Sequence, residues 1–275
     1  ISTGAVSTLA GSGSSGSANG TGTSATFKDQ YGITTDGTNV YVPDTINHKI
    51  RKIVISTGAV TTIAGSGTLG FANSNTGTSA KFYYPIDMVS DGTYLYVVDY
   101  GNHRIRKISI STGAVSTLAG SGSAGSTDGS ATSARFYYPR GITIDGNNLY
   151  VADGSNHKIR KIVISTGEVT TFAGSPAGSS TSGFNDGTGT AARFRQPFGI
   201  TSDGINLYVG DYGNHRIRKI SISTKVVTTI AGSSSGSTDA TGTSAKFRNP
   251  YGITTDGTNL YVADSGNHRI RKIVI

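Results

Sequence analysis

A repeated block runs through the whole chain and constrains the fold more than any other feature. The segment ISTGAVSTLAG at Ile1 returns in similar form at Ile55, Ile110, Ile164 and Ile222. A second block, DGTNLYVADSGNHRIRKI in its last copy, recurs in step with the first. The successive spacings are 54, 55, 54 and 58 residues, so the chain consists of five similar units. Repeats of this kind occur in proteins whose units bury their apolar surface against their neighbours.

Each unit predicts four short antiparallel strands. In the first unit we expect them near residues 32–35, 39–43, 49–55 and 59–65. Asp36 and Gly37 form an Asp-Gly step between the first two strands, which is a strong hairpin signal. Four-stranded units repeated radially describe a β-propeller. We therefore predict an all-β, five-bladed β-propeller of four-stranded antiparallel blades.

The two ends of the chain fall at complementary points of the repeat. The chain opens on a fourth-strand sequence, Ala5 to Ala10, and closes on a third-strand sequence, His268 to Val274. We expect the N-terminal strand to complete the last blade and close the ring. Residues 1–275 then form one propeller domain, although a piece cut from a longer repeat array and a designed consensus remain alternatives.

The composition excludes several classes of protein. Glycine accounts for 39 of the 275 residues and helix-forming residues are scarce, which argues against a helical protein. The chain has no cysteine, so it has no disulfide framework, zinc–thiolate site or cysteine nucleophile. No apolar run approaches the ~18 residues that a membrane-spanning helix needs.

The second block resembles the NHL repeat, a β-propeller family named for an Asn-His-Leu tripeptide. Asn-His recurs once in every unit, with Lys or Arg in the third place of the motif. Leu-Tyr-Val-Ala-Asp (Leu260 to Asp264) and the Ala-Arg-Phe…Pro…Gly-Ile lead-in (Ala134 to Ile142) are also similar to the family. The resemblance implies a propeller fold. It does not specify a function, because the family includes lyases, RNA binders and receptor ectodomains.

The histidines, asparagines and one set of aspartates of the motif are predicted to be structural. All five histidines sit in the motif, and we expect each to cap the turn between strands two and three with the nearby aspartate. Five equivalent turns do not converge on one metal, so we assign no catalytic residue, metal ligand or cofactor. The residues of this structural set are Asp44, Asn47, His48, Asp99, Asn102, His103, Asp153, Asn156, His157, Asp211, Asn214, His215, Asp264, Asn267 and His268.

The positive charge of the chain provides a second candidate site. The formal net charge is +8, and the third strand of every unit contains the basic pattern [KR]-I-R-K. Such a stripe can meet a polyanion, although long basic side chains can also cover the surface between blades. Asp87 replaces the glycine of the Pro-x-Gly-Ile pattern and could line a channel that binds a cation or substrate. The candidate contacts are therefore Arg51, Arg106, Arg160, Arg218, Arg271 and Asp87.

Long loops rich in Ser, Gly and Thr join successive units, and we expect them to be flexible and well solvated. The first three match the G-x-G-x-x-G pattern, for example at Gly11, Gly13 and Gly16, but no helical pattern follows, which excludes a dinucleotide site. An aromatic residue ends each loop (Phe27, Phe82, Phe136, Phe194 and Phe247) and is expected to anchor it to the core. We expect packing between blades for the aromatic residues that follow, with stacking on a sugar or base as the alternative.

We therefore expect a non-catalytic structural or interaction scaffold, with a protein partner or self-assembly. From the resemblance and the Ser/Thr/Gly-rich loops, we expect an extracellular or cell-surface location of the bacterial secreted type. Two alternatives remain open. One is a binder of acidic glycans or nucleic acid, and the other is a metal-dependent enzyme of the lyase or lactonase kind.

Overall fold

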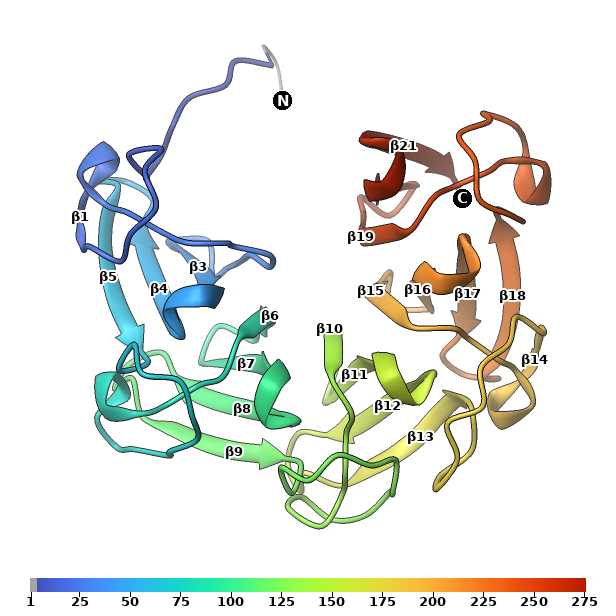
Figure 1. The fold of residues 1–275 in the computed structure, drawn as a ribbon, viewed down its shortest axis with the longest axis horizontal. Helices are drawn as coiled ribbons and strands as arrows, with labels where there is room; N and C mark the ends of the chain where they lie inside the picture. The colour runs from blue at the N-terminus through green and yellow to red at the C-terminus, as the bar shows by residue number, and fades with distance from the viewer. Residues whose placement is uncertain (1–3) are drawn as a thin grey trace. The chain divides into compact units, whose positions relative to one another are not determined.

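The structure is a computed structural model that describes residues 4–275. The chain packs as two compact units, one of residues 1–102 and 106–116 and one of residues 103–105 and 117–275. It is all-β and forms a five-bladed β-propeller, whose blades are labelled along the chain in Figure 1. The predicted fold class is confirmed, and the prediction of one domain over residues 1–275 stays a prediction.

Each blade is an antiparallel sheet in which consecutive strands are neighbours, except that the two-residue strands that come first in the first and fourth sheets pair with the last strands of those sheets. The first contains β1 (Gly20–Thr21), β2 (Thr34–Thr35), β3 (Asn39–Asp44), β4 (Lys49–Val54) and β5 (Ala59–Ala64). The second contains β6 (Pro85–Ser90), β7 (Tyr94–Asp99), β8 (Arg104–Ser109) and β9 (Val115–Ala119). The third contains β10 (Pro139–Asp145), β11 (Asn148–Asp153), β12 (Lys158–Val163) and β13 (Val169–Gly174).

The fourth and fifth blades follow the same order. The fourth contains β14 (Gly187–Thr188), β15 (Pro197–Ser202), β16 (Asn206–Asp211), β17 (Arg216–Ser221) and β18 (Val226–Ala231). The fifth has three strands, β19 (Pro250–Thr255), β20 (Asn259–Asp264) and β21 (Arg269–Val274). Residues 5–10, the expected N-terminal strand, are not in a strand, so closure of the ring by this segment stays a prediction.

Short 3₁₀ turns are the only helical elements among residues 4–275. They recur at two places in the repeat, in the loop before the first strand and between the second and third strands. They are η1 (Gly22–Ser24), η2 (Thr45–Asn47), η3 (Gly77–Ser79), η4 (Tyr100–Asn102), η5 (Gly154–Asn156), η6 (Gly189–Ala191), η7 (Tyr212–Asn214), η8 (Gly242–Ser244) and η9 (Ser265–Asn267).

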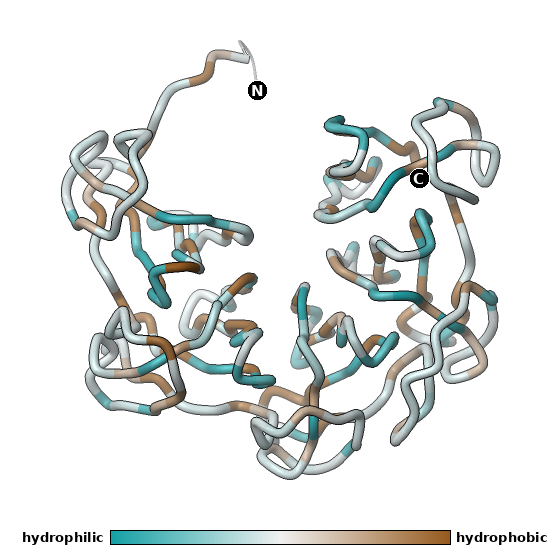
Figure 2. The backbone as a smooth tube through the Cα atoms, viewed as in Figure 1, coloured by the Kyte–Doolittle hydropathy of each residue, from teal (hydrophilic) through white to brown (hydrophobic). Residues whose placement is uncertain are grey.

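The core lies between successive sheets. Apolar residues follow the strands, whereas the long loops are mostly neutral in hydropathy (Figure 2). One cluster joins the third and fourth sheets and includes Ile159, Phe194 and Leu207, each with no exposed surface. Burying a side chain of this size stabilises the fold by about 1.5–3 kcal/mol, so stacking of neighbours stabilises each blade.

The first strands of neighbouring sheets approach closely enough to require glycine. Strand β15 packs against β10 on one side and β19 on the other, as Figure 1 also shows. A Cβ atom on Gly141 would overlap the carbonyl oxygen of Phe198, and one on Gly199 would overlap the carbonyl oxygen of Tyr251. This backbone contact explains the glycine of the Pro-x-Gly-Ile pattern.

The long loops pack on the outer strands of their own blades. Gly20 pairs with Val60, Ser74 with Val115, Gly129 with Val169 and Gly187 with Val227. The loops therefore cover the hydrogen-bonding edge of each of these fourth strands, which would otherwise be open to pairing with another chain. Most residues of the loop at positions 11–24 are nevertheless exposed, in agreement with the expected solvation, whereas the expected flexibility stays a prediction.

Candidate functional site

A buried ion pair links the second and third strands of every sheet. In the third sheet, Asp153 Oδ2 accepts from Arg160 Nη1 at 2.9 Å and from Asn156 Nδ2 at 2.8 Å. Its Oδ1 accepts the backbone N–H of Tyr137 at 2.9 Å. Burial raises the pKa of Asp153, and the charge of Arg160 opposes this shift. The same Asp–Arg pair forms between Asp44 and Arg51, Asp99 and Arg106, Asp211 and Arg218, and Asp264 and Arg271.

The other half of each guanidinium group binds the long loop. Arg160 Nη2 donates to Thr127 O at 2.9 Å and lies 2.8 Å from Asp128 Oδ1. Asp186 and Asp239 occupy the equivalent place in the fourth and fifth repeats, whereas Asn19 and Asn73 occupy it in the first two. Sequence reasoning left these acidic residues without a role, although each lies at the same point of its repeat.

These arginines also stack on the aromatic residues that end the loops. The guanidinium carbon lies 5.0 Å from the ring centroid of Phe27 in the first repeat and 4.8 Å from that of Phe247 in the fifth. Arg51, Arg106, Arg160 and Arg218 have no exposed surface. The structure therefore places them inside the blades, where a polyanion does not reach them. Their burial does not agree with the prediction that these four side chains contact a polyanion on the surface.

The motif histidines connect successive repeats. Each adopts a left-handed conformation at the end of its 3₁₀ turn, with φ of 58° at His157. His157 Nδ1 accepts the backbone N–H of Gln196, from the next repeat, at 3.1 Å. Equivalent bonds join His48 to Tyr84, His103 to Tyr138 and His215 to Asn249. The asparagine, and not the histidine as we expected, binds the turn aspartate.

Burial of these histidines lowers their affinity for protons. The pKa of His48, His103, His157 and His215 lies below the ordinary value because burial disfavours the charged ring. The charge of Arg195 lowers the pKa of His157 and His215 further. Neutral imidazole is the form that can accept the N–H bond, so the shift and the geometry agree.

The aspartates of the Asp-Gly hairpins hold their own turns. Asp203 Oδ1 accepts the N–H groups of Ile205 at 2.8 Å and Asn206 at 2.6 Å, and its Oδ2 accepts the Tyr208 hydroxyl at 2.9 Å. Burial alone would raise the pKa of Asp203, but these hydrogen bonds outweigh it and lower the pKa. Burial and the bond to Asp203 raise the pKa of Tyr208 to about 12. Asp203 therefore caps the hairpin turn between β15 and β16.

Asp87 lies in β6 and bonds locally. Its Oδ1 accepts the backbone N–H of Met88 at 2.9 Å. Gly32, just before β2 of the preceding repeat, lies against it, and a Cβ there would overlap the carboxylate. Among residues 4–275 no group of three or more His, Cys, Asp or Glu side chains is placed to hold a metal ion.

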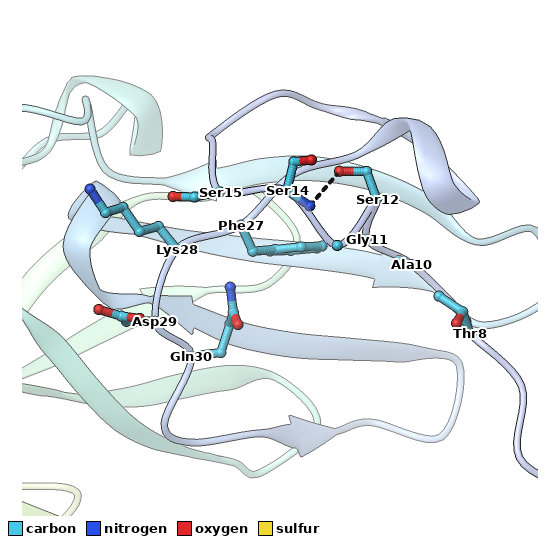
Figure 3. A pocket seen from close by; sticks show the side chains of 11 residues that line it. Thr8, Ala10, Gly11, Ser12, Ser14, Ser15, Phe27, Lys28, Asp29 and Gln30 are labelled. Atoms are coloured by element: carbon cyan, nitrogen blue, oxygen red, sulfur yellow. Dashed lines mark hydrogen bonds between the residues drawn. The ribbon is translucent and has the colours of Figure 1, made fainter.

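A pocket of about 510 Å³ lies on the first repeat (Figure 3). The Gly-Ser loop at residues 10–15 forms one wall, and Phe27 to Gln30 form another. In two later repeats the same loop is covered by the preceding repeat. A Cβ on Gly65 would lie 2.8 Å from Lys49 Cα, and one on Gly174 would lie 2.8 Å from Lys158 Cα. The pocket is thus the uncovered flank of a blade, lined by loop backbone and small hydroxyl side chains.

The aromatic residues that follow the anchors pack on one another. The ring centroids of Tyr83 and Tyr84 lie 4.9 Å apart, and those of Tyr137 and Tyr138 lie 5.0 Å apart. Phe198 and Tyr251 approach to 3.5 Å. The contacts of Phe198 with Tyr251, His48 with Tyr84 and His103 with Tyr138 join successive repeats, in agreement with the expected packing between blades.

Comparison with other proteins identifies repeats of one family. NHL repeats match residues 136–162 and 247–273. The chain is 32% identical over 249 residues to Protein SUPPRESSOR OF QUENCHING 1, chloroplastic, of Arabidopsis thaliana, with 85% of this chain and 24% of that protein covered. It is 30% identical over 282 residues to human NHL repeat-containing protein 2, with 90% and 39% covered. The chain therefore spans about a quarter to two fifths of the length of these relatives.

Solved structures of low sequence identity share the fold. A chain of the nidogen/laminin complex superposes with a TM-score of 0.63 at 19% identity, covering 90% of this chain and 76% of that one. A streptogramin B lyase superposes with a TM-score of 0.55 at 14% identity, covering 90% and 68%. No helix within residues 4–275 has the length and apolar character to cross a bilayer. Together with the five-bladed fold, the sequence matches support the NHL-repeat β-propeller family for this chain.

Proposed function

We propose that this chain is a non-catalytic binding scaffold that meets a protein partner or further copies of itself. The observation that carries the proposal is the use of the motif residues. The five aspartate–arginine pairs lie within the sheets, and the histidines at positions 48, 103, 157 and 215 accept backbone N–H groups. The aspartates, arginines and histidines of the motif therefore stabilise the blades and the contacts between them. The loops and the strand ends remain for recognition of a partner.

The same proposal includes an extracellular or cell-surface location. Loops of Ser, Gly and Thr suit a surface exposed to proteases when the loops are tied down. Here the loops are tied to the outer strands by backbone pairs and by the buried arginines. The low content of charged residues, 15%, agrees with a secreted or cell-surface repeat protein.

Crosslinking in the source material tests the proposal. A lysine-reactive crosslinker is applied to intact cells or culture supernatant, and the linked peptides of this protein are identified by mass spectrometry. A scaffold predicts reproducible links to another protein, or links between identical peptides that require two copies. The proposal would be overturned if every link joined two sites within one copy of this chain, at a crosslinker concentration that links known neighbouring proteins in the same sample.

A further inference from the structure

Arginine and aromatic side chains gather at the start of the first strands of the last three blades. Arg140, Phe198 and Tyr251 occupy the same repeat position in β10, β15 and β19, which are adjacent strands. The guanidinium carbon of Arg140 lies 4.7 Å from the centroid of the Phe198 ring, and that ring lies 3.5 Å from Tyr251. These residues thus form one continuous stack across three blades.

Two further arginines border this stack. Arg195 and Arg248 each follow an anchor phenylalanine, and their side chains lie over the turns at Gly213 and Gly266. A Cβ on either glycine would come within 2.7 Å of the arginine Cγ, so the absence of a side chain lets the arginine stem lie flat. Both arginine residues are exposed to solvent.

One tyrosine joins these elements into a single surface. Tyr212 precedes Gly213, and its ring centroid lies 6.1 Å from that of Phe198 and 6.4 Å from that of Tyr251. The charges of Arg195 and Arg248 both act on His215 and lower its pKa, after the larger effect of burial. We call this surface, made of Arg140, Arg195, Arg248, Phe198, Tyr212 and Tyr251, the arginine face.

The arginine face has an uncompensated positive charge. The turn aspartates beneath it, Asp153, Asp211 and Asp264, are buried and already paired with Arg160, Arg218 and Arg271. Within residues 4–275, none of Arg140, Arg195 and Arg248 forms an ion pair. Arg140 Nε is buried and has no hydrogen-bond partner.

The geometry favours carboxylates over bases or sugar rings. Phe198, at the centre of the stack, is 8% exposed and has Arg140 and Tyr251 packed on it, so it offers no open platform for stacking. What remains accessible is charge on planar guanidinium groups, and this group binds carboxylate in a bidentate manner. Arginines on three successive blades suit an extended segment that carries several carboxylates.

We propose that the arginine face binds an acidic segment of a partner protein. This inference rests on the proposed scaffold function and names the chemistry of one partner. Arg140 is held in place by its stack on Phe198, and Arg195 and Arg248 by their packing on Gly213 and Gly266. Because these side chains are ordered before the partner binds, binding costs less conformational entropy.

Binding of a fluorescein-labelled oligoglutamate peptide to the full chain tests the inference by fluorescence anisotropy. The variant R140Q/R195Q/R248Q removes the three charges, and R135Q/K225Q/K272Q removes three exposed charges elsewhere. We expect the first variant to weaken binding about tenfold or more and the second about twofold or less. Circular dichroism melting confirms that both variants are folded.

Three results would overturn the inference. They are equal affinity of the wild type and R140Q/R195Q/R248Q, equal losses in the two variants, and tighter binding of an oligouridylate or oligogalacturonate of matched charge than of oligoglutamate. Crosslinking of the first variant in the source material separates this inference from the scaffold proposal. If R140Q/R195Q/R248Q keeps its partner links and binds oligoglutamate as the wild type does, the arginine-face inference is contradicted but the scaffold proposal is not. If the wild type itself shows no partner links, the scaffold proposal is contradicted.

Discussion

Removal of one buried arginine should destabilise the protein strongly. Arg160 has no exposed surface, and its guanidinium group makes four hydrogen bonds, two to carboxylates and two to loop carbonyls. The substitution Arg160→Met keeps most of the apolar stem but leaves Asp153 buried without its counter-charge. Breaking a buried pair in this way costs about 3–5 kcal/mol. We expect a loss of this size in the free energy of unfolding.

Two matched variants show whether burial is the cause. Lys161→Met changes the next residue on the same strand, which is not fully buried, and should alter stability by about 0.5 kcal/mol or less. Arg271→Met removes the equivalent arginine of the fifth repeat, where the side chain is 10% exposed and Asp239 is 83% exposed. Asp264 is as fully buried as Asp153, but Asp239 is exposed and water reaches the place of the Arg271 side chain, so Arg271→Met should cost less than Arg160→Met.

Urea unfolding followed by tyrosine fluorescence and by far-ultraviolet circular dichroism measures these differences. The two signals also show whether the unit that contains Arg160 unfolds in the same transition as the rest of the chain. A loss below about 1 kcal/mol for Arg160→Met would refute the reasoning, because it would mean that Asp153 is not left unpaired. A larger loss for Arg271→Met than for Arg160→Met would refute the role of burial.

Three more predictions follow from the site. The folded-state pKa of His157 lies below its unfolded value, so protonation favours unfolding and stability should fall as pH drops through about 6.5. The melting temperature of His157→Asn should depend less on pH between 5 and 8 than that of the wild type. An equal dependence in the two proteins would contradict the role of the hydrogen bond from Gln196 N–H to His157. Gly199→Ala should lower the melting temperature because its Cβ meets the carbonyl of Tyr251, whereas Gly252→Ala, whose nearest neighbour would be Ala263 at 3.8 Å, should be tolerated. If the protein lies on the cell surface, a membrane-impermeant biotin reagent that reacts with lysine should label it on intact cells, and labelling only after lysis would refute this location.

The repeat predicted the fold because each local signal agreed with the others. The Asp-Gly hairpins, the short connections and the period of four strands all indicate stacked sheets, and the strands fall where we expected them. The missing fourth strand of the last blade could not be predicted in the same way. A matching strand sequence at the N-terminus says which segment could pair, but pairing depends on the placement of distant parts of the chain.

The chemistry of the site was harder to predict from sequence. The pattern [KR]-I-R-K looks like a surface stripe, although only its second basic position is Arg in all five repeats. That regularity is the signal of a buried guanidinium, because bidentate and stacked sites do not accept lysine. The arginine face could not be found from the repeat pattern, since Arg140 and Arg195 occupy different repeat positions and only packing brings them to one surface.

Substitution of all five motif histidines tests most directly the claim that the motif is structural and recognition lies elsewhere. The variant replaces His48, His103, His157, His215 and His268 with asparagine, which tolerates the left-handed backbone of these positions. Crosslinking in the source material and melting are then measured together. The account predicts a lower melting temperature with the same partner links as the wild type. A variant that melts like the wild type but has lost its partner links would contradict the account and make the histidines the functional site.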